Sequence, residues 1–166
     1  MEPLITLVAV TLVLLALGAL GVRRLRPWPV ALRGGLAAMF VLTGVAHFVG
    51  MRDELIAMVP TFLPAPELLV TITGLLELAG AVGLLIPRTA ALAAGGLALM
   101  LIAMFPANVH LALTGTDLEP MSQLLPRTLL QVVFVAAAVT ACVTSARAPR
   151  SPARAANVPV GVTDAS

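Results

Sequence analysis

Five apolar runs of about twenty residues each dominate the chain and limit what it can fold into. They cover residues 3–22, 30–50, 67–86, 90–113 and 126–145. A bilayer core takes about 20 residues of helix to cross, so each run is long enough to span it. We therefore predict an all-α fold, a polytopic transmembrane helix bundle with five spans.

The composition excludes a soluble domain. Hydrophobic residues make up 60% of the chain and charged residues only 11%, whereas soluble domains carry about 25% charged residues. Although the pI is near 10.0, the net charge is only +2, and the arginines stand beside apolar runs, where membrane topology signals lie. Nucleic acid is therefore excluded as a partner. The single cysteine, Cys142, excludes an internal disulfide and a paired-cysteine redox motif.

The first run is interpreted as a retained span and not as a cleaved signal peptide. It starts next to an acidic residue, Glu2, and its basic cluster of Arg23, Arg24 and Arg26 comes after it. A signal peptide has a basic start and an apolar core of about 7–15 residues. The expected organisation is an N-terminal transmembrane helix over residues 1–27, a four-helix bundle over 28–146 and a disordered cytoplasmic tail over 147–166.

The arginines predict the orientation. Eight of them lie after the first and third runs, at the start of the second run and in the tail, and two lie on the opposite side. The eight are Arg23, Arg24, Arg26, Arg33, Arg88, Arg147, Arg150 and Arg154, and the two are Arg52 and Arg127. Because arginine collects on the cytoplasmic side, the N-terminus is expected outside and the C-terminus in the cytoplasm of a multi-pass cell-membrane protein.

The connection over residues 51–66 is predicted to lie outside, and it is unusually apolar. Its first half reads as a short amphipathic helix in the membrane interface, and Pro60, Pro64 and Pro66 then favour extended turns. The connection either only covers the mouth of the bundle or also admits a ligand.

Glu77 is the most informative candidate for a functional site. It lies about 15 Å from either end of its run, too deep for its carboxyl group to reach water. Such a group must have a partner inside the bundle or stay protonated. The functional interpretation is a ligand-binding or proton-relay residue. The structural alternative is a neutral side chain that hydrogen-bonds a neighbouring helix.

His47 is the second candidate, about one turn from the outer end of its run. We expect it about 10 Å from Glu77 in depth, too far for direct contact, and joined to it through Asn108 or water. The alternative is an interfacial histidine bonded to a loop carbonyl. Arg33 lies near the inner surface of the same run and is a weaker candidate, because its side chain favours the cytoplasmic surface.

Pro106 and Asn108 form the third candidate. A proline inside a helix removes a backbone donor and frees the carbonyl four residues earlier, here that of Ile102, so a kinked polar spot is expected. The alternative is a kink needed only for packing. Gln131 is a weaker polar candidate, and His110 lies about 200° around the helix from Asn108, so these two cannot line one pocket.

No metal site is predicted, because two histidines and one deep glutamate lack a local ligand spacing. Haem held by His47 and His110 is a weaker alternative, since both lie three residues from an outer helix end. Phosphate-binding loops and nucleophile elbows are missing from the sequence.

Four segments resemble the DoxX-like family of small bacterial integral membrane proteins: "GVAHF", "MVPTFLPAP", "TGLLELAGAVGLLIPRTAALAA" and "MFPANVHLAL". The resemblance covers about residues 30–140 and implies a four-helix DoxX-like core with one N-terminal transmembrane helix added. The family takes its name from a protein associated with a thiosulfate:quinone oxidoreductase, and some members are linked to membrane redox complexes and oxidative stress. By resemblance, His47, Glu77, Pro106 and Asn108 fall in its recurring motifs.

Two classes of function follow. In the first, the chain is a membrane subunit or scaffold of a quinone-linked redox or oxidative-stress complex, with a membrane or soluble redox partner and a quinone as its bound cofactor. In the second, it is a carrier or chaperone-like binder of a small or lipidic ligand, without catalytic activity. No motif supplies an intrinsic cofactor or electron carrier, so we do not expect an autonomous enzyme.

Overall fold

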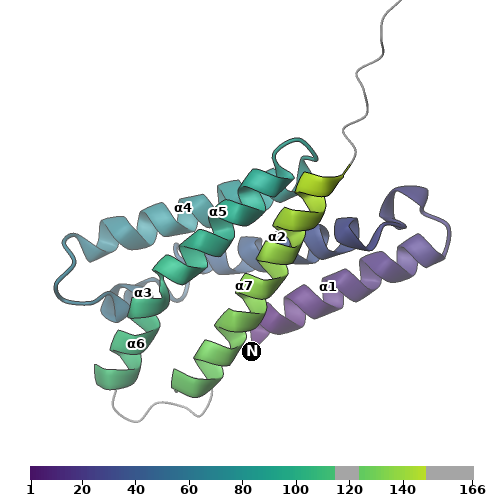
Figure 1. The fold of residues 1–166 in the computed structure, drawn as a ribbon. Coiled ribbons are helices and arrows are strands. Elements are labelled where there is room, and N and C mark those ends of the chain that lie inside the picture. Colours follow the sequence, from purple (N-terminus) through teal and green to yellow (C-terminus); the bar gives the residue numbers. More distant parts are fainter. Residues whose placement is uncertain (115–123, 149–166) are drawn as a thin grey trace, which may run out of the picture.

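The computed structural model describes residues 1–114 and 124–148, and every regular element within them is a helix (Figure 1). The elements are α1 (Glu2–Ala19), the 3-10 turn η1 (Arg23–Leu25), α2 (Trp28–Ala46), α3 (Arg52–Met58), α4 (Pro66–Leu85), α5 (Ala90–Ala103), α6 (Phe105–Thr114) and α7 (Leu124–Arg147).

Five stretches are long and apolar enough to cross a membrane: α1, α2, α4, residues 90–113 of α5 and α6, and α7. The predicted all-α bundle with five candidate spans is therefore confirmed. The disordered tail expected beyond Arg147 falls almost wholly outside the described residues.

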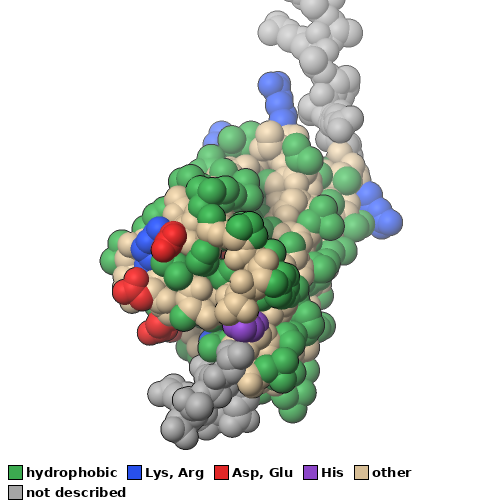
Figure 2. All heavy atoms as spheres, turned by 90° about the vertical axis from the view of Figure 1, so that its left-hand side faces the viewer, with side chains coloured by type: hydrophobic (Ala, Val, Ile, Leu, Met, Phe, Trp, Pro, Cys, Tyr) green, Lys and Arg blue, Asp and Glu red, His purple; other side chains and the backbone are tan. Residues whose placement is uncertain are grey.

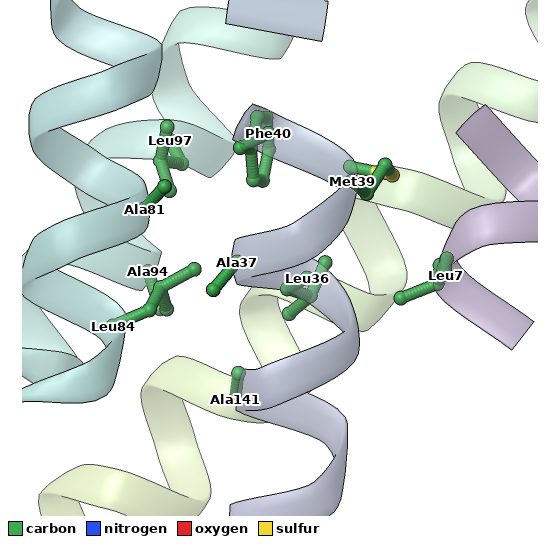
Figure 3. Packing of buried hydrophobic residues seen from close by; sticks show 10 residues of the cluster. All are labelled: Leu7, Leu36, Ala37, Met39, Phe40, Ala81, Leu84, Ala94, Leu97 and Ala141. Carbon is green, nitrogen blue, oxygen red and sulfur yellow. The ribbon is translucent and has the colours of Figure 1, made fainter. Parts of the chain in front are cut away.

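Helix α2 lies at the centre of the packing. Helix α1 packs against α2, which also contacts α4 and α7, and α5 packs against α4 and α7. Side chains on different sides of α2 pack against different helices, as Figure 3 shows. Met39 faces Leu7 of α1, while Phe40 lies toward Ala81 of α4 and Leu97 of α5. Phe40 and Met39 are each 1% exposed, so the core of the bundle forms around this one helix.

Small residues set the close approach of α2 and α4. A Cβ built on Gly44 would lie 2.9 Å from Leu78, and one on Gly74 would lie 2.6 Å from the Cβ of His47. Carbon atoms prefer separations of about 3.5–4.0 Å, so larger residues at these two positions would push the helices apart. Lipid tails give no hydrophobic drive between helices, and contacts of this kind hold such bundles together.

The fourth predicted run is divided into two helices. Helix α5 ends at Ala103 and α6 begins at Phe105, with Pro106 in the first turn of α6. The N–H of Met104 still donates to the carbonyl of Met100, and the N–H of Ala107 donates to Met104. Proline has no N–H to donate and its ring crowds the preceding turn, so the break lies where the kink was predicted.

The two ends of the bundle differ in charge. Asp53 and Glu54 of α3 and Glu67 of α4 are exposed at one end, which we call the acidic end. Figure 2 views the molecule from the α3 side and shows acidic side chains among apolar ones. The opposite, arginine-rich end holds Arg23, Arg24, Arg26, Arg33, Arg88 and Arg147. The seven-residue α3 confirms the short helix predicted in the connection over residues 51–66.

Candidate functional site

Three polar side chains meet between α2 and α4, and we call them the α2–α4 cluster: Thr43 of α2, His47 directly after the last residue of α2, and Glu77 of α4. His47 and Glu77 are each only 3% exposed, and Thr43 is half-buried. Thr43 and His47 are one helical turn apart, so both point to the same side of α2. The cluster is thus a polar site enclosed by apolar helices.

Glycines bring the cluster together. Gly44 of α2 lies against Leu78 and the Cβ of Glu77, and Gly74 of α4 lies against His47. These pairings run in opposite directions along the two helices, so α2 and α4 are antiparallel. They also place the end of α2 beside the middle of α4, because α4 extends about two turns beyond the level of His47.

The hydroxyl of Thr43 links Glu77 to the backbone of α2. Its Oγ1 lies 2.5 Å from Oε2 of Glu77 and 3.3 Å from the carbonyl oxygen of Met39. An ionised Glu77 accepts the hydroxyl proton of Thr43. A protonated Glu77 instead donates to Thr43 Oγ1, which then donates to the Met39 carbonyl. Both arrangements satisfy the carboxyl oxygen, so this site can hold or release a proton without losing its hydrogen bond.

The two ring nitrogens of His47 differ in their hydrogen bonding to the described residues. Its Nδ1 lies 2.9 Å from the carbonyl oxygen of Thr43. Because a carbonyl only accepts hydrogen bonds, Nδ1 carries a proton, and Nε2 of the neutral ring is an acceptor. Nε2 is buried and has no hydrogen-bond partner among the described residues. A buried acceptor without a partner costs about 1–3 kcal/mol, so this atom is where a ligand would gain most from binding.

Arg52 ties the cluster to the acidic end. Its guanidinium donates to the carbonyl of His47 at 3.1 Å and to Oγ1 of Thr71 at 3.1 Å. The first bond satisfies a carbonyl at the C-terminus of α2, where the helix itself supplies no partner. The second bond holds the start of α3 against α4.

A second polar network, the α6–α7 cluster, occupies the break between α5 and α6. Asn108 donates from Nδ2 to Oε1 of Gln131 at 2.7 Å and accepts at Oδ1 from Arg127 at 3.2 Å. Gln131 donates in turn to the carbonyl of Leu101 at 2.5 Å. This carbonyl lies in the last turn of α5, where backbone acceptors lose their helical partners. The network therefore closes the break by hydrogen bonding and joins α5, α6 and α7.

Within residues 1–114 and 124–148 there is no group of three or more histidine, cysteine, aspartate or glutamate side chains that could hold a metal ion. The α2–α4 cluster offers one carboxylate, one imidazole and one hydroxyl, which suits hydrogen bonding and proton exchange.

A family described as "Domain of unknown function (DUF8561)" matches residues 36–142, which is more than half of the chain. The chain belongs to the DUF8561 family. The region that matches contains every residue of the two clusters, whereas α1 lies before it. No curated protein and no solved structure is significantly similar to this DUF8561 protein.

The structure corrects the expected separation of His47 and Glu77. Nδ1 of His47 lies 4.0 Å from Oε2 of Glu77, in place of a gap of about 10 Å that needed a bridge. The expectation assumed that the ends of the two runs lie at one level, but α4 extends beyond the end of α2. Asn108 is bonded in the α6–α7 cluster, and Thr43 is the residue that links the pair.

The remaining candidates lie elsewhere. Pro106 and His110 line a hollow of about 390 Å³ beside Pro60, apart from Asn108, as the angle around the helix predicted. Gln131 joins Asn108 in the α6–α7 cluster. Arg33 lies at the arginine-rich end, and its Nε is buried without a partner among the described residues.

Sequence reasoning missed two members of the clusters. Thr43 was not among the predicted site residues, although its position one turn before His47 was an available signal. Arg127 was considered only for topology, although it stands one turn before Gln131 in the same helix. In both cases a polar residue four positions from a candidate shares its helix face.

Proposed function

We propose that this DUF8561 protein is a DoxX-like multi-pass membrane subunit of a quinone-linked redox or oxidative-stress complex, and that the α2–α4 cluster binds the head group of a reduced quinone. The observation that carries the proposal is Nε2 of His47, a buried hydrogen-bond acceptor without a partner among the described residues.

The protonation of His47 determines which ligand fits. Since Nδ1 donates to the Thr43 carbonyl, Nε2 of a neutral ring needs a ligand that offers a donor. A quinol head group offers hydroxyl donors, whereas a quinone carbonyl does not. The surrounding helix faces are apolar, which suits a lipid-soluble ring that makes a few directed hydrogen bonds.

Glu77 complements this role. Its carboxyl oxygen lies 4.0 Å from the ring nitrogen of His47 and shares the hydroxyl of Thr43. The cluster therefore places a second proton-exchanging group beside the one that would meet the ligand. We assign no electron transfer to this chain, because the electron carrier belongs to the membrane or soluble partner of the proposed complex.

The proposed orientation follows from the charge difference between the two ends. The arginine-rich end faces the cytoplasm and the acidic end, with α3, faces outside. In this orientation the N-terminus of α1 is outside and the C-terminus of α7 is inside the cell.

A carrier or chaperone-like binder of a small or lipidic ligand is the second candidate function. It is favoured by the hollow of about 390 Å³ lined by Phe62, Phe105 and Pro106, which is largely apolar and extends along α6 to Leu113. A carrier would take up its ligand through this hollow and perform no chemistry.

The experiment measures binding of a short-chain ubiquinol to the protein in lipid nanodiscs by isothermal titration calorimetry. His47→Asn keeps a donor near the Thr43 carbonyl and removes the Nε2 acceptor, and His110→Asn is the matched control. We expect His47→Asn to weaken binding at least about tenfold, the effect of losing one buried hydrogen bond, and His110→Asn to bind as the wild type.

Equal binding by both variants would contradict the quinol site. Binding that weakens only in His110→Asn would favour the carrier function, because His110 lines the hollow near Pro106.

A further inference from the structure

A groove on the outer surface of α4 and α5 is separate from both polar clusters. It has a volume of about 650 Å³, and its two ends on α4 are marked by Leu76 and Ile86. Leu76 is 52% exposed and Leu92, on the other wall, is 81% exposed, so the groove opens away from the bundle. In a membrane this surface faces lipid.

The groove exists because small residues line it. Gly80 and Gly83 of α4 lie against Leu97 and Ala93 of α5, so the helices touch along the floor of the groove. Gly96 is different, because a Cβ built on it meets nothing within 4 Å. The space beside Gly96 is therefore empty, and a side chain added there would fill it without disturbing a neighbour.

The length of the groove matches one leaflet of a bilayer. From Leu76 to Ile86 the helix rises by about 15 Å, which is half of the roughly 30 Å hydrocarbon core. Leu76 stands next to Glu77, near the middle of its span, and Ile86 lies at the arginine-rich end. The groove thus runs from the middle of the membrane to one surface.

An exposed arginine stands at the surface end of the groove. Arg88 lies in the turn between the lining residues Ile86 and Thr89 and is exposed. Its side chain makes no hydrogen bond or ion pair with any other described residue. Among the described residues, the acidic side chains lie away from the α4–α5 turn, so none of these carboxylates competes for Arg88.

We propose that the α4–α5 groove is a binding site for an anionic phospholipid, with one acyl chain along the groove and the lipid phosphate at Arg88. The apolar groove has the length of one leaflet, which accounts for the acyl chain. The exposed Arg88 at its end accounts for the preference for a negative head group. This inference is independent of the quinol site, which lies between α2 and α4.

The test is native mass spectrometry of the purified protein titrated with equimolar phosphatidylglycerol and phosphatidylcholine. We expect the wild type to retain phosphatidylglycerol, and Arg88→Gln to lower the preference over phosphatidylcholine about fivefold, the effect of one arginine near an anionic surface. Arg24→Gln is the control with the same loss of charge, placed at the α1–α2 turn, and it should retain the preference.

A second pair of variants tests the groove itself. Gly96→Leu fills the empty space and should abolish the retained lipid, while Ala136→Leu, at an exposed small residue of α7, should not. Equal retention of both lipids by the wild type, or an equal effect of Arg24→Gln and Arg88→Gln, would overturn the proposal. So would unchanged retention in Gly96→Leu, or a protein dimer that this variant disrupts in place of a lipid adduct.

Discussion

Gly74→Ala tests whether the close contact of α2 and α4 holds the α2–α4 cluster together. The added Cβ would lie 2.6 Å from the Cβ of His47, 2.9 Å from Phe48 and 3.0 Å from the Cγ of His47. Phe48 is 38% exposed and can rotate away, but the Cβ of His47 is fixed to the backbone. Relief therefore requires α2 to move by on the order of 1 Å.

Overpacking of this kind costs about 1–3 kcal/mol, which is about a 5- to 140-fold change in the unfolding equilibrium. Alanine also favours the helix over glycine by about 1 kcal/mol, and this gain offsets part of the cost. Gly96→Ala isolates the gain, because nothing lies within 4 Å of its added Cβ. The difference between the two variants is therefore the cost of the contact itself.

The single cysteine of the chain provides the assay. Cys142 is partly buried, and a Cβ on Gly95 would lie 3.4 Å from its Sγ, so the thiol packs between α7 and α5. Labelling of this thiol by a maleimide dye during heating reports unfolding in mild detergent. We expect Gly74→Ala to unfold at a lower temperature than the wild type, and Gly96→Ala at the same or a higher one. Equal midpoints for the two variants would mean that the close contact at Gly74 does not hold α2 and α4 in place.

Four further predictions concern the polar residues, the break and the topology. Gln131→Leu leaves the Leu101 carbonyl and the Asn108 amide without a partner, so it should destabilise the protein by about 1–3 kcal/mol in the thiol-labelling assay. If quinol binding requires an ionised Glu77, Glu77→Gln should fold as the wild type but lose quinol binding. Glu77→Leu should impair both folding and quinol binding. Full binding by Glu77→Gln would exclude a functional role for this carboxyl group. Pro106→Ala should straighten the break and lengthen the distance between spin labels at positions 99 and 113 toward about 21 Å. Membrane insertion should persist and ligand binding should weaken. An unchanged distance would contradict the role of the proline. A reporter at the C-terminus should be cytoplasmic and one at the N-terminus external, and two reporters on one side would mean an even number of spans.

The spans could be predicted because hydrophobic length is a local property. Each predicted run overlaps a described helix, and Pro106 marked the break between α5 and α6. The bonded carbonyl is that of Leu101, one residue before the Ile102 carbonyl that the proline was expected to free. Which of these two carbonyls accepts the hydrogen bond depends on where Gln131 of α7 reaches α5. The local sequence of α5 holds no information about that contact.

The geometry of the candidate site could be predicted from the sequence only in part. His47 and Glu77 could be selected from their depth, but the stagger of α2 against α4 depends on how Gly44 and Gly74 meet, which is a tertiary contact. The role of Thr43 could not be predicted for a related reason. A threonine in a helix commonly bonds its own backbone, and only the approach of α4 gives its hydroxyl a second partner in Glu77.

The most direct test of the α2–α4 site is the ¹⁵N spectrum of histidine-labelled protein in nanodiscs, because the chain has only two histidines. His110→Asn assigns the remaining ring signals to His47. We predict a proton on Nδ1, which faces the Thr43 carbonyl, and an Nε2 signal that shifts toward the hydrogen-bonded range when ubiquinol is added. An Nε2 that already carries the proton without ligand, or ubiquinol that leaves the His47 signals unchanged, would rule out a quinol site at His47.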